Sequence, residues 1–368
     1  MSKFSKQLSI LCLVAIFTPG LTAEQTSFES AWDYAKLYQN TDGDYLNLSG
    51  RIHLDSAWFD SSQGEYNDIS WRRFRFGFKG KYGRTSAALE ADIDLNEDLG
   101  DSYNRLTDAN LSWKFDGDMK VTALKHSAGF TLDGKTSSKK LFTPQRNNLT
   151  NNLWFTSEYF TGVSIKGNLV SASDWSYNAG LFSSDDSDEI GFTDASYFTL
   201  FSLGRKLDAN ALWNEAEFRV DYVYNDVHED GNTRDFTHVV SLSSKFASGK
   251  WHLWNDLAMG QGDLGQSDLW GLVIMPFYQQ TENFQWVMRY TYLDSDDHNG
   301  LRLGRYENKI VDGKGDRYHE VYGGANYFFN SHKLKLHLGL QYTDMADGAD
   351  DVGQYDGWGL TLALRAYW

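Results

Sequence analysis

Hydrophobic and polar residues alternate with a period of two along most of this chain. The C-terminal stretch 355–368 shows the pattern clearly, with Trp358, Leu360 and Leu364 on one face and mainly Gly, Thr and Ala, plus Arg365, on the other. Such alternation is typical of a β-strand whose two faces meet different surroundings. The pattern recurs along the chain and leaves little apolar sequence for a soluble core. It therefore predicts that lipid covers the apolar faces, as in a transmembrane β-barrel.

The alternation predicts sixteen strands, most of them long enough to cross a membrane at a tilt. The expected ranges are 45–59, 70–82, 84–95, 105–116, 118–126, 157–167, 172–183, 195–207, 213–227, 234–246, 250–260, 268–279, 282–295, 317–330, 332–346 and 355–368.

Short turns and longer loops alternate strictly between these strands. The long loops are expected at 60–69, 96–104, 127–156, 184–194, 228–233, 261–267, 296–316 and 347–354. Outer-membrane barrels have this layout, with short periplasmic turns and long external loops. We therefore predict an all-β fold, a 16-stranded antiparallel transmembrane β-barrel over 45–368, with both termini at the short-turn end.

The N-terminal residues read as a targeting segment followed by a short lead-in. Residues 1–23 begin with Lys3 and Lys6, continue with an apolar stretch and end in a small-residue cleavage site, so they are expected to be a signal peptide. The only cysteine, Cys12, lies within them. Apolar spacing in 24–44 predicts a short amphipathic helix in a periplasmic segment ahead of the barrel.

Acidic residues dominate the chain and concentrate in the long loops. Without the signal peptide, 32 basic and 50 acidic residues remain, which disfavours nucleic-acid partners. Leaving 127–156 aside, the other seven long loops carry 22 acidic and four basic residues. Clusters such as 185–189 and 347–351 are either a solvated rim or binding sites for Ca²⁺ or Mg²⁺, which prefer oxygen ligands. No other cofactor or metal is expected.

Loop 127–156 has the opposite charge. It carries Lys135, Lys139, Lys140 and Arg146 with a single acid, Asp133, and it is the longest connection. Loops of this length without secondary structure are usually functional or disordered. Were it folded into a barrel, it would place several cations where the pore is narrowest, and rings of cations select anions in known pores.

The second expected strand also carries cations. Phe74, Phe76 and Phe78 share one face, and the cations on the other face are Arg73, Arg75, Lys79 and Lys81. A cation facing mid-membrane lipid would cost about 2–4 kcal/mol, so these cations should face the lumen. Other residues expected on the lumen wall are Arg51, Lys114, Arg219, Arg289, Lys333, Lys335 and Arg365, with the acids Asp55, Glu90, Asp92, Asp94, Glu217 and Asp221. The wall is either a mutually neutralising polar lining or an anion track.

Two motifs resemble the porin O/P family of phosphate- and polyphosphate-selective outer-membrane porins. They are GRIHLD at 50–55 and RRFRFGFKG at 72–80. The resemblance implies a homotrimer of 16-stranded barrels in the outer membrane of a Gram-negative bacterium, with the third external loop folded into the lumen and small anions such as phosphate passing a basic constriction. Carried onto this sequence, the constriction residues are Lys125, Lys135, Lys139, Lys140 and Arg146, with Arg73 and Arg75 on the wall.

Other functions stay open at this point. The acidic outer rim would repel anions, which favours a weakly selective general-solute channel or a sugar channel as the alternative. A barrel enzyme would need a Ser/His or Asp/His constellation. The nine histidines are scattered, and neither GxSxG nor HExxH occurs. We therefore expect no enzymatic activity.

Overall fold

The computed structural model describes residues 30–153, 158–169, 172–185, 188–192, 195–298, 300–349 and 352–368. The expected signal peptide, 1–23, lies outside these residues, as do positions 24–29 of the expected lead-in. Within the described residues no helix is long and apolar enough to span a membrane.

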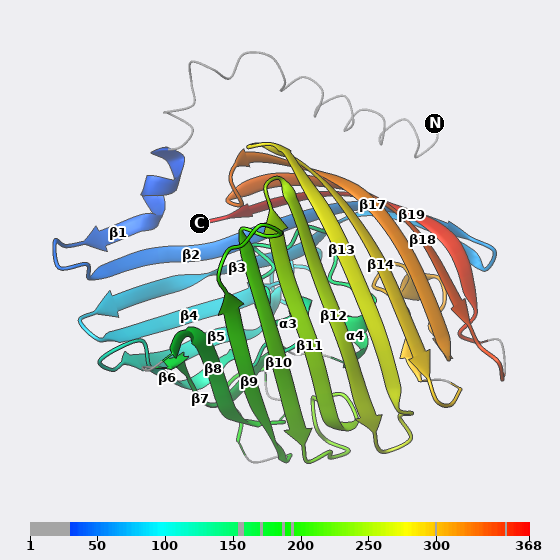
Figure 1. Cartoon of the computed structure of the whole chain (residues 1–368), viewed down its shortest axis with the longest axis horizontal. Coiled ribbons are helices and arrows are strands. Elements are labelled where there is room, and N and C mark those ends of the chain that lie inside the picture. The colour runs from blue at the N-terminus through cyan, green and yellow to red at the C-terminus, as the bar shows by residue number, and fades with distance from the viewer. Residues whose placement is uncertain are drawn as a thin grey trace.

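Sixteen long antiparallel strands of the described chain form the wall of a barrel (Figure 1). They are β2 (Tyr45–Ser61), β3 (Gly64–Tyr82), β4 (Thr85–Ile93), β5 (Tyr103–Lys114), β6 (Lys120–Ser127), β7 (Tyr159–Leu169), β8 (Ala172–Ser183), β9 (Tyr197–Leu207), β10 (Glu215–Asn225), β11 (Phe236–Ser248), β12 (Trp251–Gly262), β13 (Leu269–Thr281), β14 (Phe284–Ser295), β17 (Arg317–Asn330), β18 (Leu334–Ala346) and β19 (Tyr355–Tyr367).

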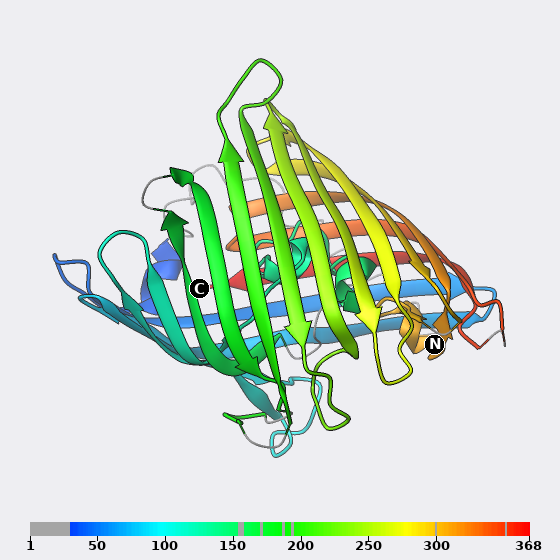
Figure 2. The ribbon, with the colours of Figure 1, turned by 60° about the horizontal axis from the view of Figure 1, so that its bottom comes forward.

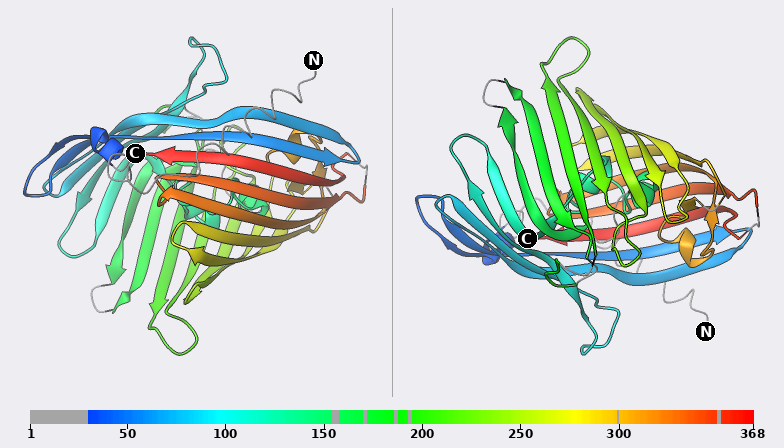
Figure 3. Two further views of the ribbon diagram at one scale, coloured as in Figure 1. Left: turned by 90° about the horizontal axis from the view of Figure 1, so that it is seen from above. Right: turned by 90° about the horizontal axis from the view of Figure 1, so that it is seen from below.

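The sheet closes because its last strand pairs with its first. Each strand pairs with its neighbour in the chain, and β19 then pairs with β2 from Gly357↔Ser61 to Tyr367↔Arg51. The views along and across the molecule show a ring of strands without an open edge (Figures 1 and 3). The prediction of a closed 16-stranded barrel is confirmed, and most strand ends lie within about two residues of their expected positions.

The prediction of a long loop over 60–69 is wrong. β2 and β3 instead run on into a hairpin joined by residues 62–63. The extension packs on a segment further along the chain, because the rings of Phe59 and Tyr66 lie 5.4 Å and 5.9 Å from the ring of Tyr306. Because residues 60–69 are mostly polar, nothing in the sequence indicated this tertiary contact.

The described part of the N-terminal lead-in, residues 30–44, contains one helical turn and an added strand. The turn is the 3₁₀-helix η1 (Ala31–Ala35), and β1 (Lys36–Gln39) pairs with the start of β2. The indole of Trp32 donates a hydrogen bond of 2.7 Å to the carbonyl of Tyr367. The lead-in thus covers the seam where the first and last strands meet, close to the C-terminus (Figure 1).

The two faces of the wall differ as the alternation predicted. On β19 the outward Trp358 is 56 % exposed and Leu364 is 38 % exposed, whereas the inward Thr361 and Arg365 are each 3 % exposed. The outward-facing positions of the other strands also carry exposed apolar side chains. The outer face therefore has the apolar surface that hydrocarbon requires.

The interior holds an apolar core that we did not expect. Two short helices, α3 (Leu132–Lys135) and α4 (Asn148–Leu153), lie inside the ring of strands (Figures 1 and 2). Leu149 and Leu153 of α4 are fully buried in one cluster with inward residues of β9 to β14, among them Phe198 and Val273. The inward positions of these strands therefore bury hydrophobic side chains against a folded-in segment.

A cation placed on the outer face should destabilise the barrel. Leu340 lies at the middle of β18 and is 49 % exposed. We expect Leu340→Arg to lower the free energy of unfolding in lipid vesicles by about 2–4 kcal/mol, because the guanidinium would face hydrocarbon. Urea titration followed by tryptophan fluorescence measures this. Leu99→Arg, at a loop position that is 94 % exposed, is the control, and equal unfolding of both variants would contradict the lipid-facing assignment.

Candidate functional site

The long basic connection between β6 and β7 lies against the inner face of the barrel. Its described part, residues 128–153, is called the inner loop. The amide of Leu132 donates a hydrogen bond of 2.7 Å to the Asp256 carboxylate on β12, and the Lys135 ammonium lies 3.2 Å from the Ser243 hydroxyl on β11. Figure 2 shows both helices of the inner loop enclosed by strands. These contacts hold its N-terminal half against the wall.

The tip of the inner loop is held by cations on β14 and β19. The Arg289 guanidinium on β14 donates 3.0 Å and 3.1 Å hydrogen bonds to the Thr143 hydroxyl and the Gln145 carbonyl. The Arg365 guanidinium on β19 donates one of 3.0 Å to the Pro144 carbonyl. Hydrogen bonds to charged donors are the stronger kind, so these cations fix the loop backbone.

These contacts assign a structural role to cations that were expected to line an open pore. Lys335 on β18 also donates to an inner-loop carbonyl, that of Leu141. Arg289 makes a bidentate pair with Glu320, at 2.7 Å and 3.1 Å. Arg289, Lys335 and Arg365 therefore lie on the inner face of the wall and hold the inner loop. They do not form a water-exposed anion track.

A β-bulge turns one more arginine inward than the alternation predicted. On the hairpin of β2 and β3, His53 faces Arg73 while the next residue, Leu54, faces Trp71, so Arg72 is the extra residue of the bulge. The Arg72 guanidinium lies 3.5 Å from the Gln145 side chain of the inner loop. Strict alternation would have pointed Arg72 at lipid, and a guanidinium in lipid costs free energy. This unfavourable placement was the signal in the sequence for a bulge at the Arg-Arg pair.

Four arginines surround a small cavity between the inner loop and the wall. The cavity measures about 40 Å³, and its cationic lining is Arg72, Arg73, Arg146 and Arg365. It is called the arginine pocket. The Ser138 hydroxyl accepts a hydrogen bond of 2.9 Å from Arg73 and one of 2.8 Å from Arg51. A buried water needs about 10–15 Å³, so the pocket has room for a few waters or one small anion.

Carboxylates neutralise part of this positive charge. Glu158, just before β7, lies 3.4 Å from Arg146 and 3.9 Å from Arg73. Asp55 pairs with Arg365. Two carboxylates thus face the four arginines that line the pocket, which leaves a local excess of positive charge. Neither Glu158 nor its bridging position was picked out in the sequence.

The neighbouring wall is more nearly neutral. Arg75 lies 3.2 Å from Asp92, and Glu90 lies 3.7 Å from Arg51 and 3.3 Å from Lys79. All five face the lumen as expected. These pairs fit the neutralising lining, one of the two interpretations of the wall.

The predicted constriction residues divide into two groups. Lys135, Lys139, Lys140 and Arg146 all lie on the inner loop. Lys125 lies elsewhere: its side chain is buried at the end of β6, and its ammonium donates to the backbone carbonyls of residues 188 and 189 in the next long loop. The contacts of Lys125 thus tie two elements together.

Asp94, expected on the lumen wall, lies outside it. It follows the last residue of β4 and accepts a hydrogen bond from Asn96 within its own loop. The expectation failed because β4 ends at Ile93, two residues before its expected end. Lys81 lies on β3 two positions after Lys79 and therefore on the same face, and it is exposed at the short-turn end of the strand.

A second external segment reaches into the barrel mouth. Residues 300–316, the mouth loop, contain the hairpin β15 (Leu301–Arg302) with β16 (Lys314–Gly315) and the 3₁₀-helix η2 (Glu307–Lys309). The Tyr306 hydroxyl donates a hydrogen bond of 2.5 Å to Asp55, and Asn152 of α4 bonds the backbone of Arg302 at 2.8 Å and 3.0 Å. In the sequence this segment falls in a long external loop, for which no inward packing is predicted. Its buried Leu301, Leu303 and Tyr306 were the signal that it packs inward.

A cation site at the acidic rim stays a prediction. Within the described ranges, no three His, Cys, Asp or Glu side chains gather in a way that could hold a metal ion. Asp186, Asp350 and Asp351, which belong to the two acidic clusters, lie outside the described residues.

A closed antiparallel barrel with an apolar outer band and a partly charged interior defines an outer-membrane channel. A family model, phosphate-selective porin O and P, matches residues 46–243, more than half of the chain. The chain belongs to this family, and its location is the outer membrane of a Gram-negative bacterium. The family and the fold indicate a channel rather than an enzyme. No curated protein matches the chain.

Solved structures of bacterial outer-membrane proteins share the fold at low sequence identity. An anion-selective porin from Comamonas acidovorans has a TM-score of 0.63 at 12 % identity over 88 % of this chain and 100 % of that chain. OmpF of Salmonella typhi, in complex with daunomycin, has a TM-score of 0.63 at 14 % identity over 90 % and 99 %. OprB of Pseudomonas putida gives 0.61 at 12 % identity over 94 % and 98 %. These similarities show the barrel architecture.

The charge on the inner loop should depend on pH near neutrality. Burial, together with the neighbouring Arg51 cation, lowers the pKa of Lys139 to about 7. Lys139 is therefore cationic below that pH and neutral above it, so the preference for chloride over potassium should fall as pH rises from about 6 to about 8. Reversal potentials in a KCl gradient measure this. Lys139→Gln should flatten the pH profile in this interval, and a wild-type profile without a slope would contradict the assignment.

Proposed function

We propose that the protein is a water-filled channel for the passive diffusion of small anions such as phosphate, with the inner loop as its constriction. The observation that supports this most strongly is the arginine pocket, in which four guanidiniums face only two carboxylates. Two unit charges about 4 Å apart interact by about 4 kcal/mol at an effective dielectric of 20. An excess of positive charge beside the inner loop therefore favours an anion over a cation of equal size.

The pocket also supplies the right hydrogen-bond chemistry. Guanidinium groups present planar pairs of donors that match the oxygens of phosphate. Within the described residues Arg72 makes no ion pair, and its side chain has one hydrogen-bond contact there, the weak one of 3.5 Å with Gln145. Arg72 is therefore the arginine best placed to exchange a protein contact for an anion.

The lysines of the inner loop would attract anions beside the pocket. Lys140 is exposed, and the Lys139 ammonium lies 5.0 Å from the ring of Tyr367. Neither forms an ion pair in the part of the chain that the structure describes. Several cations that converge near a constriction select anions, whereas a single cation in a wide pore selects little.

The oligomer and its surroundings follow from the same proposal. OmpT of Vibrio cholerae, at a TM-score of 0.57, 12 % identity and coverage of 88 % of this chain and 99 % of that chain, has been described in a trimer form. We propose a homotrimer for this chain as well, in contact with outer-membrane lipid through the apolar band. The absence of enzymatic activity remains a prediction.

A weakly selective channel is the alternative function. The acidic outer rim favours it, because carboxylates at the mouth lower the local concentration of anions. The ion selectivity depends on whether the acidic rim or the arginine pocket is the narrower region, since charge acts most strongly where water is scarce.

Removal of the Arg72 charge tests the arginine pocket directly. We expect Arg72→Gln to lower the chloride preference in a KCl gradient and to raise the phosphate concentration that half-blocks chloride current about 10-fold, because a close charge contact is lost. Arg84→Gln is the matched control, since Arg84 is half exposed at a short turn and pairs with Asp116 at 2.6 Å. Identical behaviour of the two variants in planar bilayers would overturn the role of the pocket.

Charge reversal on the inner loop tests the constriction. Lys139→Glu combined with Lys140→Glu should reduce chloride and phosphate conductance and shift the reversal potential toward potassium, because two cations become two acids beside the pore. The control reverses Lys114 and Lys250, which lie at the short-turn end. An unshifted reversal potential would place Lys139 and Lys140 outside the permeation path.

A further inference from the structure

A second group of cations lies at the short-turn end of the barrel, away from the arginine pocket. Two adjoining cavities of about 820 Å³ and 960 Å³ open there and share five lining residues, Phe142, Glu217, Lys245, Trp254 and His332. Together they are called the vestibule. Each has the size of cavities that bind small organic molecules.

The shared wall of the vestibule is aromatic. Phe142 of the inner loop lies 5.2 Å from the ring of Trp254 and 4.7 Å from the ring of Phe277, centre to centre. The Lys245 ammonium stands 4.2 Å above the ring of Trp254. Ring edges and faces at this wall therefore lie directly beside a positive charge.

Three lysines of the vestibule have no carboxylate partner at ion-pair distance within the described ranges. Lys135, Lys140 and Lys245 line one cavity together. The Lys135 ammonium lies 3.2 Å from the neutral Ser243 hydroxyl. The Lys245 ammonium lies over the Trp254 ring, with Glu217 at the opposed register position on β10. Like charges that share a cavity repel one another, so a bound anion would relieve this repulsion.

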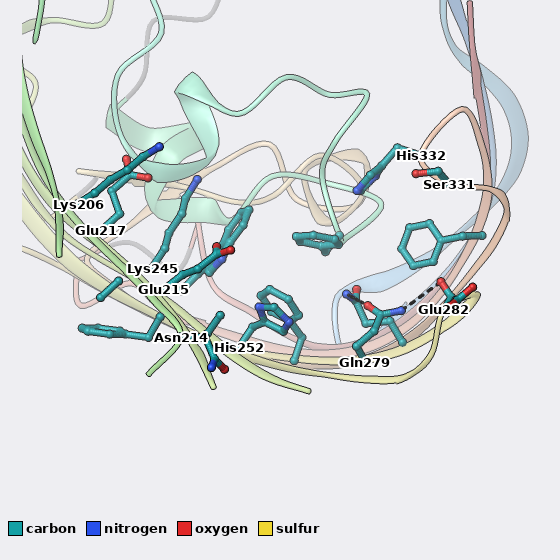
Figure 4. Close-up of a pocket in the computed structure, with 18 of the residues that line it drawn as sticks. Lys206, Asn214, Glu215, Glu217, Lys245, His252, Gln279, Glu282, Ser331 and His332 are labelled. Carbon is teal, nitrogen blue, oxygen red and sulfur yellow. Dashed lines mark hydrogen bonds between the residues drawn. The ribbon is translucent and has the colours of Figure 1, made fainter. Parts of the chain in front are cut away.

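This surface suits one class of solute better than others. A phosphate ion carries two charges and gains little from the apolar faces of aromatic rings, which attract cations rather than anions. Figure 4 shows Glu217 and Glu215 on the same side of the cavity as Lys245 and Lys206, and these carboxylates disfavour multiply charged anions. A flat apolar group with one negative charge can use both the rings and the lysines.

We propose that the vestibule binds aromatic monocarboxylates. The aromatic ring lies against Phe142 and Trp254, and the carboxylate pairs with Lys245, with Lys135 and Lys140 adding longer-range attraction. This site goes beyond the small-anion function proposed above, because it shares no lining residue with the arginine pocket and takes a different class of solute. Its failure would leave the arginine pocket untouched.

Sodium benzoate is the probe, and the first test needs only the wild-type channel. Benzoate added from the short-turn side should reduce single-channel KCl current at a concentration about 3- to 10-fold lower than acetate, because aromatic contacts add about 0.5–1.5 kcal/mol. Benzyl alcohol, which has the ring without the charge, should block more weakly than benzoate. Equal block by benzoate and acetate, or by benzoate and benzyl alcohol, would overturn the proposal.

Two variants locate the site. Lys245→Gln should weaken benzoate block about 10-fold, through the loss of a close charge pair. Trp254→Leu should remove the difference between benzoate and acetate. Lys250→Gln is the matched control, since Lys250 lies at the same end of the barrel but lines neither cavity. Equal weakening by Lys245→Gln and Lys250→Gln would place benzoate elsewhere in the pore.

The Arg72→Gln channel separates this proposal from the function proposed above. It should keep wild-type block by benzoate while its block by phosphate weakens. Parallel loss of both effects would show one shared anion site and would overturn the vestibule as a separate site. Heat-modifiable migration on gels confirms that each variant forms a closed barrel before its current is measured.

Discussion

Backbone hydrogen bonding is the constraint on which this structure depends. A strand in hydrocarbon has no water to satisfy its amide and carbonyl groups, so every strand must find two neighbours and the sheet must close. The pairing of β19 with β2 meets this requirement along the whole seam. Once the sheet is closed, alternate side chains have only two environments, and the chemistry of the inner positions decides what the interior can hold.

The inner loop is held to the wall in two ways. The inward apolar residues of β9 to β14 bury the leucines of α4. Cations from β14, β18 and β19 donate hydrogen bonds to the carbonyls of the inner-loop tip. The inner loop is therefore fixed by hydrophobic packing at one end and by charge-assisted hydrogen bonds at the other. A loop fixed in this way keeps its lysines and Arg146 at defined positions beside the pore.

Most charges in the wall are paired, and this limits which of them can act on a solute. Arg75, Arg289 and Glu90 each have a partner of opposite charge. A paired charge contributes little to the field in the pore, so selectivity depends on the few cations that outnumber their acids. The structure places these around the arginine pocket and along the inner loop, with a second group in the vestibule.

The alternation of side chains by itself determined the class of fold, the number of strands and most of their ends, because only a closed barrel lets a chain of such mixed polarity meet lipid. The cations of β3 could be assigned to the lumen from the same argument. The bulge at Arg72, the bridging Glu158, the packing of the mouth loop and the position of Lys125 became visible only in the tertiary structure, although Arg72 and the apolar residues of the mouth loop were signals in the sequence. Each depends on a contact between segments far apart in the chain: Arg72 with Gln145, Tyr306 with Asp55, and Lys125 with the backbone at 188–189. Periodicity reports which face a residue occupies, but it cannot report which distant segment will occupy the space in front of that face.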